Sequence, residues 1–162
     1  MRKSLEAINL AALAFMFWVY WNARFGPGRL PDRVPTHFDL AGNPNGWDTS
    51  SSLPLFSVVA VAIYLMLTLA VRFPAYFNYP VEVTAENRPR LEALTVDLIA
   101  WLKTEIICLF AWIQWVIIDM ARRGRGDLSL LALLPVFLVV LIGTLVWFIV
   151  AMRRAARTES GS

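Results

Sequence analysis

The residues best suited to chemistry lie in one polar stretch between apolar runs, Leu30–Ser52, which holds the only histidine of the sequence, His37. On an extended segment His37 and Asp39 would point the same way, because successive side chains of a strand alternate between its faces. A zinc site draws on three or four protein ligands, however, and the single cysteine, Cys108, is distant in the chain. We therefore predict no metal site and no catalytic centre. We expect His37 to hydrogen-bond backbone groups of the Gly42–Trp47 turn and so to lock this loop.

A second group of candidates lies inside a long apolar helical pattern, residues 91–120. Charged side chains in a membrane are costly and usually face the interior of a helix bundle or a water-filled cavity. At 100° per residue, this pattern has two opposite stripes, one of polar and tryptophan residues and one of isoleucines. The first comprises Asp97, Trp101, Thr104, Glu105, Cys108, Trp112 and Trp115, and the second comprises Ile99, Ile106, Ile113 and Ile117. We predict that the tryptophan stripe faces the other helices and that the isoleucine stripe faces lipid.

Glu105 is the acid that this arrangement submerges most deeply. If residues 91–102 project from the membrane, Asp97 is solvated and Lys103 reaches the interface along its apolar stem. Glu105 then either forms an interhelix hydrogen bond or serves as an ion or proton site. Trp112 is a further candidate on the same stripe.

The elements that must position these residues are membrane helices. Of the 162 residues, 58% are hydrophobic, and the mean hydropathy is +0.57, above that of a soluble domain. Four apolar blocks, at about 5–23, 53–71, 91–120 and 128–152, each have the roughly 20 residues that a bilayer-spanning helix needs. We predict an all-α integral membrane protein with four transmembrane helices, as one domain over residues 1–157 with a disordered tail at 158–162. Thr84 and Asn87 are candidate caps of the third helix.

The connection between the first two helices is predicted to be structured but not helical. Pro31 and Pro35 exclude a helix there, because proline lacks the N–H and clashes with the preceding turn. Gly42 and Gly46 supply positions where φ can be positive, and Asn45-Gly46 is a strong signal for a tight turn.

The expected path of this loop is a short extended piece, Val34–Asp39, followed by a compact turn. The turn would bring Trp47 back towards His37 and Phe38.

The distribution of basic residues predicts the orientation. The net charge of +3 comes from arginines beside the apolar blocks, a pattern that fits membrane anchoring and not nucleic-acid binding. With the N-terminus inside, the cytoplasmic segments hold eight lysines and arginines and the opposite segments hold six. This bias favours cytoplasmic termini and an extracytoplasmic His37 loop.

One pattern in the loop is LP, then P-x-H-F-[DN], then glycine and an aromatic residue. It is carried by Leu30, Pro31, Pro35, His37, Phe38, Asp39, Gly42, Gly46 and Trp47. This stretch resembles the signature of the SdpI-type membrane proteins, which share a domain of unknown function, DUF1648. The later segments FNYPVEVTAENRPR and WLKTEI also look like short single-domain members of this group, although Asp48 stands where many relatives have glycine.

The resemblance implies a small helical protein of the bacterial cytoplasmic (inner) membrane with a structured loop between its first two spans. The best-known members are longer than this chain. They protect a cell from an extracellular peptide toxin and also take part in signalling through a sequestered repressor. The resemblance therefore implies a protective or sensing role.

Three functions remain open from the sequence. The first is non-enzymatic binding of a peptide, a lipid or a membrane-protein partner at the extracytoplasmic loop, without a cofactor. Its candidate residues are His37, Asp39, Asn43, Trp47, Glu105 and Trp112. The second is a small transporter or transporter subunit, which would require a homo-oligomer or a larger partner, with Glu105 as its ion or proton site. The third is a membrane enzyme acting on a lipid-linked substrate, with His37 as general base oriented by Asp39.

Overall fold

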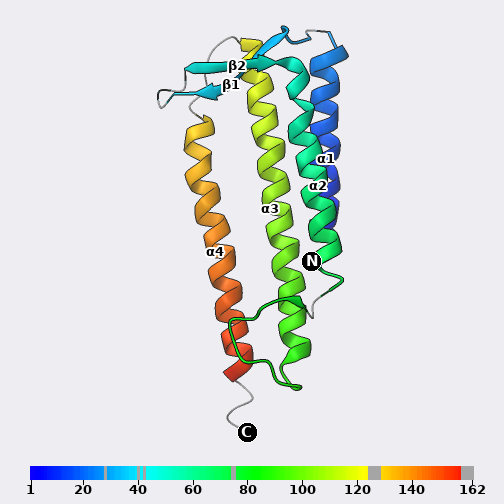
Figure 1. The fold of residues 1–162 in the computed structure, drawn as a ribbon, viewed down its shortest axis with the longest axis vertical. Helices are drawn as coiled ribbons and strands as arrows, with labels where there is room; N and C mark the ends of the chain where they lie inside the picture. Colours follow the sequence, from blue (N-terminus) through cyan, green and yellow to red (C-terminus); the bar gives the residue numbers. More distant parts are fainter. Residues whose placement is uncertain (28, 40, 42, 74–75, 124–128, 158–162) are drawn as a thin grey trace.

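Long helices lying side by side, with a β-hairpin across one end, make up the described part of the computed structural model (Figure 1). The structure describes residues 1–162 except 28, 40, 42, 74–75, 124–128 and 158–162. The predicted disordered tail and Gly42 therefore lie outside the described residues. The elements in chain order are α1 (Arg2–Phe25), β1 (Arg33–Phe38), β2 (Pro44–Thr49), the short 3-10 helix η1 (Ser50–Ser52), α2 (Pro54–Ala70), α3 (Arg88–Arg123) and α4 (Ser129–Arg157).

Among the described residues, three helical segments are long and apolar enough to cross a membrane, judged by length and composition. They are Arg2–Phe25, Ser50–Ala70 and Leu133–Arg157. These segments coincide with the first, second and fourth predicted spans, which confirms a mostly helical membrane protein. The third predicted span is the 36-residue helix α3, which is not among them.

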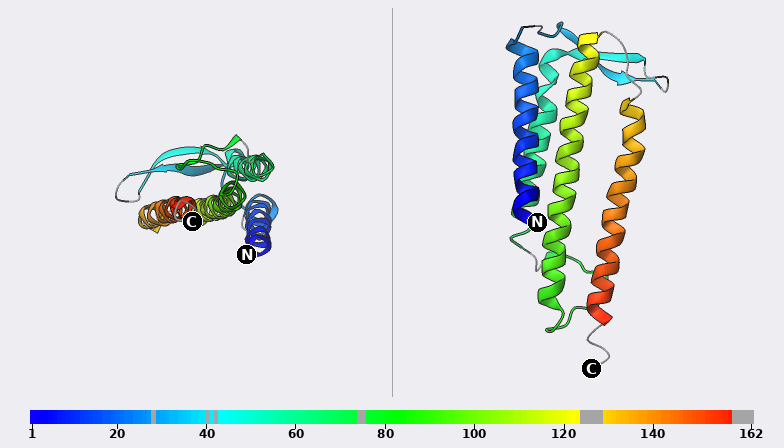
Figure 2. Two further views of the ribbon diagram at one scale, coloured as in Figure 1. Left: turned by 90° about the horizontal axis from the view of Figure 1, so that it is seen from below. Right: turned by 180° about the vertical axis from the view of Figure 1, so that it is seen from behind.

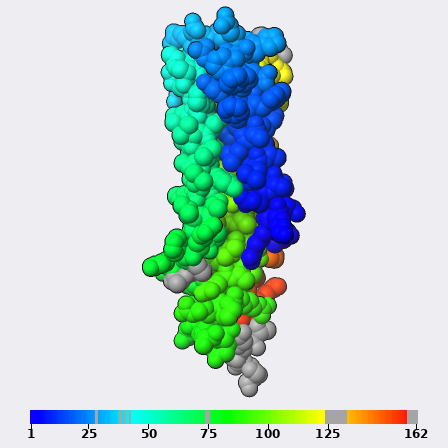
Figure 3. Space-filling view, turned by 90° about the vertical axis from the view of Figure 1, so that its right-hand side faces the viewer, coloured from blue at the N-terminus to red at the C-terminus, as the bar shows by residue number. Residues whose placement is uncertain are grey.

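Helix α3 is the centre of the assembly. It packs against α1, α2 and α4, and the view from below and the view from behind both show α4 on the side of α3 away from α1 (Figure 2). Midway along the bundle, Met16 and Ala60 pack against Ile107 and Ala111 of α3. Helices α1 and α2 also lie side by side (Figure 3).

The predicted assignment of faces on α3 is only partly correct, because Glu105 of the tryptophan stripe does meet α4 while two residues of the isoleucine stripe are buried. Ile99 and Ile117 are 8% and 4% exposed, whereas Trp101 and Trp115 are 37% and 43% exposed. A helical wheel with two opposite stripes allows a single lipid-facing side, but a helix with three helical neighbours buries side chains in several directions. The Trp115 indole is instead among the exposed side chains of α3, and Trp101 lies beside α4.

The connection between α1 and α2 is an antiparallel hairpin, so the all-α fold class needs a correction. Asn45-Gly46 is not the turn that the sequence predicts, because both residues lie within β2, where Gly46 is opposite His37. A Cβ atom on Gly46 would lie 2.8 Å from the Cβ of His37. This glycine therefore permits a close approach of two strands and does not make a turn.

The hairpin is anchored by its first strand. Val34 is fully buried and packs with Val19 and Ala23 of α1, Leu53, and Ile117 and Ile118 of α3. The ladder is irregular between Pro35 and His37, next to a residue that has no N–H to donate.

The predicted capping of α3 is confirmed. The Thr84 N–H donates to Asn87 Oδ1 over 2.9 Å, and the Asn87 N–H donates to Thr84 Oγ1 over 3.2 Å, as in a reciprocal capping box. Before this cap, the connection from α2 packs Tyr79, Val81 and Val83 against the ends of α3 and α4.

Candidate functional site

The hairpin presents His37 to solvent and does not use it as a lock. The His37 side chain is exposed, and no hydrogen bond joins its imidazole to another described residue. Trp47 is 48% exposed and pairs with Pro35, so it does not shield His37 from water. The predicted hydrogen bonds from His37 to the turn are therefore wrong.

Asp39 closes the tip of the hairpin. Its Oδ1 accepts hydrogen bonds from the N–H groups of Ala41 and Asn43, over 2.9 and 2.8 Å. Its own N–H donates to the Asn43 carbonyl over 2.9 Å. Aspartate at the start of a turn commonly bonds the backbone ahead of it in this way. Asp39 and Asn43, which were predicted as binding candidates, therefore hydrogen-bond to each other and stabilise the tip of the hairpin.

The structure does not bring Glu105 or Trp112 to the hairpin. The hairpin packs on α3 near Ile117, and Glu105 lies 12 residues earlier (117 − 105) on the same helix, about 18 Å along its axis. Trp112 is half-buried between them. A catalytic group of His37, Asp39 and Glu105 is therefore not assembled. Among the described residues, no group of three His, Cys, Asp or Glu side chains could hold a metal ion.

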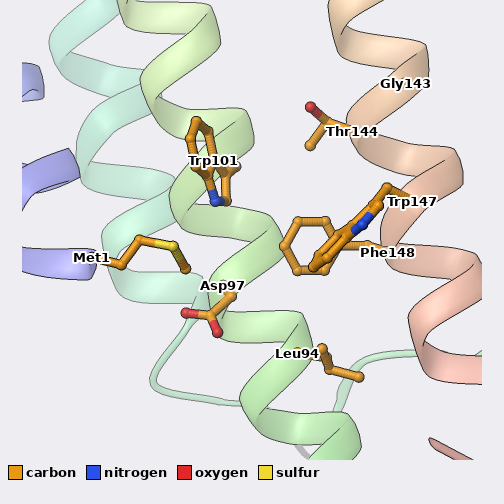
Figure 4. Close-up of a pocket in the computed structure, with 8 residues that line it drawn as sticks. All are labelled: Met1, Leu94, Asp97, Trp101, Gly143, Thr144, Trp147 and Phe148. Atoms are coloured by element: carbon orange, nitrogen blue, oxygen red, sulfur yellow. The ribbon is translucent and has the colours of Figure 1, made fainter.

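A cavity of about 450 Å³ lies between α3 and α4, and Figure 4 shows the side chains around it. Trp101 comes from α3, while Trp147 and Phe148 come from α4, with Phe148 directed towards α3. The Trp147 and Phe148 rings meet edge to face, with centroids 4.5 Å apart. The remaining lining residues are Met1, Leu94, Asp97, Gly143 and Thr144.

A second hollow of about 490 Å³ adjoins the first, because Leu94, Gly143 and Trp147 line both. This hollow also has two basic residues, Arg90 of α3 and Arg154 of α4. A Cβ atom added at Gly143 would have no other atom within 4 Å. We call the two hollows together the α3–α4 groove; it is open beside Gly143, aromatic along its length and basic at one end.

Two acidic residues flank the α3–α4 groove. Asp97 pairs with Arg2 over 2.5 Å, and Arg2 also donates to the Ala93 carbonyl over 3.2 Å, so α1 closes one side. Glu105 Oε1 accepts a 2.5 Å hydrogen bond from the Thr144 hydroxyl. Its other oxygen, Oε2, is buried without a partner. The predicted interhelix hydrogen bond of Glu105 is therefore confirmed.

A polar network joins α1, α2 and α3 on the other side of the central helix. Lys103 Nζ donates to Glu6 Oε2 over 2.7 Å and to Thr68 Oγ1 over 3.0 Å. The same ammonium lies 4.6 Å from the centroid of the Tyr64 ring, and the Tyr64 hydroxyl donates to Glu6. Lys103 is therefore a buried interhelix residue and does not extend to the interface as predicted.

Asn9 belongs to the same region. It is fully buried, one turn along α1 from Glu6 and near that carboxylate. Neither polar atom of its amide has a hydrogen-bond partner of ordinary geometry among the described residues. Glu6 and Asn9 were not among the predicted residues, although they interrupt the apolar block that begins at Leu5, and such interruptions commonly mark interior-facing positions.

Comparison with known proteins confirms the resemblance over part of the chain. Residues 7–63 match the family model described as domain of unknown function (DUF1648), which spans most of α1, the hairpin and the first half of α2. An uncharacterized protein of Archaeoglobus fulgidus is 34% identical over 86 residues, which are 48% of this chain and 45% of that relative. The alignment thus spans less than half of either protein. No solved structure matches the chain.

Proposed function

We propose that this chain, whose residues 7–63 carry the DUF1648 domain, is a non-enzymatic, multi-pass membrane protein that binds an amphiphilic membrane molecule in the α3–α4 groove. The observation that carries the proposal is the 450 Å³ cavity lined by Trp101, Trp147 and Phe148. Apolar pockets with a few polar groups at their edges are typical of small-molecule sites. Here the polar groups are Asp97 and Thr144 at the first hollow and two arginines at the second.

In this proposal four helices cross the membrane, because α3 spans it together with α1, α2 and α4. Asp97 of α3 pairs with Arg2, the first residue of α1. Because α3 begins 9 residues before Asp97 (97 − 88), the first turns of α3 extend beyond the end of α1. Residues 97–123 leave about 40 Å of helix, enough to cross a hydrocarbon layer of about 30 Å. Glu6 and Thr144 engage Lys103 and Glu105 inside the bundle, which lowers the cost of placing these charges in a membrane.

In the proposed orientation both termini are cytoplasmic, in the bacterial inner membrane, and the hairpin lies outside. The end of the bundle with the chain termini then carries the larger number of lysines and arginines, as the positive-inside rule requires. The exposed Trp47 and His37 on the ordered hairpin offer a surface for a peptide or protein partner, in keeping with a protective or sensing role.

Photo-crosslinking tests the binding site. Purified protein is placed in bilayers that contain phosphatidylcholine with a photoactivatable acyl chain, and the labelled residues are mapped by mass spectrometry. We expect labelling concentrated on the peptides around Trp101 and Trp147. Replacing Gly143 by leucine fills the groove where a side chain meets open space, and should remove most of that labelling.

The matched control is Val139→Leu, which enlarges a strongly exposed side chain of the same helix that does not line either hollow. Labelling spread evenly over the outward faces of α2 and α4, and unchanged by Gly143→Leu, would contradict the proposal.

Ion or proton transport is the second candidate function. It is favoured by the unpartnered, buried Oε2 of Glu105, a carboxylate oxygen that could accept a proton or a cation. Reconstituted vesicles would show reduced flux for Glu105→Gln but not for Glu92→Gln, whose carboxylate pairs with Arg88 at the start of α3. Equal flux in wild type and Glu105→Gln would exclude this role for Glu105.

A further inference from the structure

We infer that the α3–α4 groove selects an anionic phospholipid, with one acyl chain lying against Gly143 and Trp147 and the phosphate held between Arg90 and Arg154. This inference rests on the proposed function, because it names the ligand class of the same groove. It adds that the headgroup lies at one defined end of the groove and that a negative charge on the headgroup strengthens binding.

The apolar part of the groove has the shape that an acyl chain requires. The two hollows, of about 450 and 490 Å³, share Leu94, Gly143 and Trp147 and so form one continuous path along α3 and α4. At Gly143 the surface of α4 has no side chain, and the added Cβ would meet nothing within 4 Å. A flexible chain can lie in this opening, whereas a transmembrane helix of about 10–12 Å diameter cannot enter it without separating α3 from α4.

The charged part of the groove complements a phosphate. Arg90 and Arg154 come from different helices, yet both line the second hollow. Guanidinium groups suit phosphate because their N–H donors match its oxygen geometry.

The membrane location agrees with this assignment. Arg90 and Arg154 lie at the end of the bundle that the positive-inside rule places in the cytoplasm. The cytoplasmic leaflet is also the leaflet with a negative surface potential, which attracts clustered basic residues. An anionic lipid of that leaflet therefore meets the arginines at headgroup depth, and its chain extends towards Trp147.

Fluorescence quenching by brominated lipids tests the inference. The intact protein is placed in nanodiscs of phosphatidylcholine that contain increasing fractions of either phosphatidylglycerol or phosphatidylcholine with brominated chains. The difference between wild type and Trp147→Phe isolates the signal of Trp147. We expect half-maximal quenching of Trp147 at a roughly thirtyfold lower fraction of phosphatidylglycerol, the preference that two basic side chains would give.

Charge-matched variants locate the headgroup. Replacing both Arg90 and Arg154 by glutamine should remove the preference for phosphatidylglycerol. Replacing both Arg72 and Arg153 by glutamine should preserve it, because these two residues carry the same charges at the same end of the bundle but do not line either hollow. Since all four side chains are exposed, both double variants should fold.

The outcomes separate the inference from the proposed function. Equal quenching of Trp147 by both lipids would overturn the headgroup assignment while leaving acyl-chain binding in place. If the Arg72 and Arg153 double variant also lost the preference for phosphatidylglycerol, general surface charge would explain the effect. That result would also overturn the headgroup assignment. Trp147 shielded from both lipids, together with a dimer in native mass spectrometry, would assign the groove to a second copy of this chain and overturn both proposals.

Discussion

At residue scale, two glycines show how the same substitution can have different effects on the stability of this protein. Gly46 and Gly143 both lie within regular elements, β2 and α4. The space beside Gly46 is occupied by His37, whereas the space beside Gly143 is open. Gly46 therefore serves the packing of the hairpin, and Gly143 serves the opening of the groove.

Alanine at these two positions gives the first prediction. Gly46→Ala should destabilise the protein by about 1–3 kcal/mol, because the new Cβ forces the strands apart. Gly143→Ala should leave stability unchanged or raise it by up to about 1 kcal/mol, because alanine is the better helix former. Melting temperatures in detergent provide the measurement, and equal melting temperatures for the two variants would contradict this account of Gly46.

At the scale of elements, the ion pair between α1 and α3 joins two side chains that differ in how far they are exposed. The Lys103 side chain is 7% exposed and the Glu6 side chain is 39% exposed. The lysine thus depends on its partner for compensation, whereas the glutamate has access to surroundings outside the bundle. Loss of either partner leaves an uncompensated charge, and the cost is larger where that charge is more deeply buried.

The second prediction follows from this asymmetry. Glu6→Leu should destabilise the bundle by about 2 kcal/mol or more, because it leaves the Lys103 ammonium buried without a carboxylate. Lys103→Met should cost less, because the remaining carboxylate is partly exposed. The double variant should be more stable than Glu6→Leu. Denaturant unfolding in mixed micelles measures all three, and a larger loss for Lys103→Met would reverse the assignment.

The existence of the helices was easier to predict from the sequence than which side of each helix is buried. Long apolar blocks and the Thr84–Asn87 cap define helices locally, so their existence could be predicted from short segments. Which side of α3 is buried depends on three neighbouring helices, and a single helical wheel does not contain that information. The pairing of Glu6 with Lys103 spans 97 residues, and the lone acid near Leu5 gave only a partial signal.

The candidate site was harder to predict for the same reason. His37, Asp39 and Asn43 attracted attention because they are polar residues in a predicted loop, and the structure gives the last two a local hydrogen-bonding role. The α3–α4 groove depends on the absence of a side chain at Gly143 and on the spacing of two helices. Neither property appears in the residue types of the loop between α1 and α2, which lies in the segment that matches the DUF1648 model.

The whole molecule has two different ends, and this difference leads to the third prediction. One end carries the hairpin, and the other carries the connection between α2 and α3 together with the end of α4 (Figures 1 and 2). In a Cys108→Ser background, Trp47→Cys should react with a membrane-impermeant maleimide in intact cells. Asn78→Cys should react only after the cells are permeabilised. The reverse pattern would invert the proposed orientation, and labelling of both from outside would contradict the four-span arrangement.

Gln114 gives the bundle a particular order of assembly. Its amide Nε2 donates to the Met16 carbonyl of α1 over 2.8 Å, and its Oε1 accepts from the Ser57 hydroxyl of α2 over 2.7 Å. Helices α1 and α2 contact each other far less than either contacts α3. During synthesis these two helices emerge from the ribosome before Gln114 does. We therefore expect the two helices that match the family model to associate only loosely in the lipid until α3 is inserted and Gln114 bonds to both.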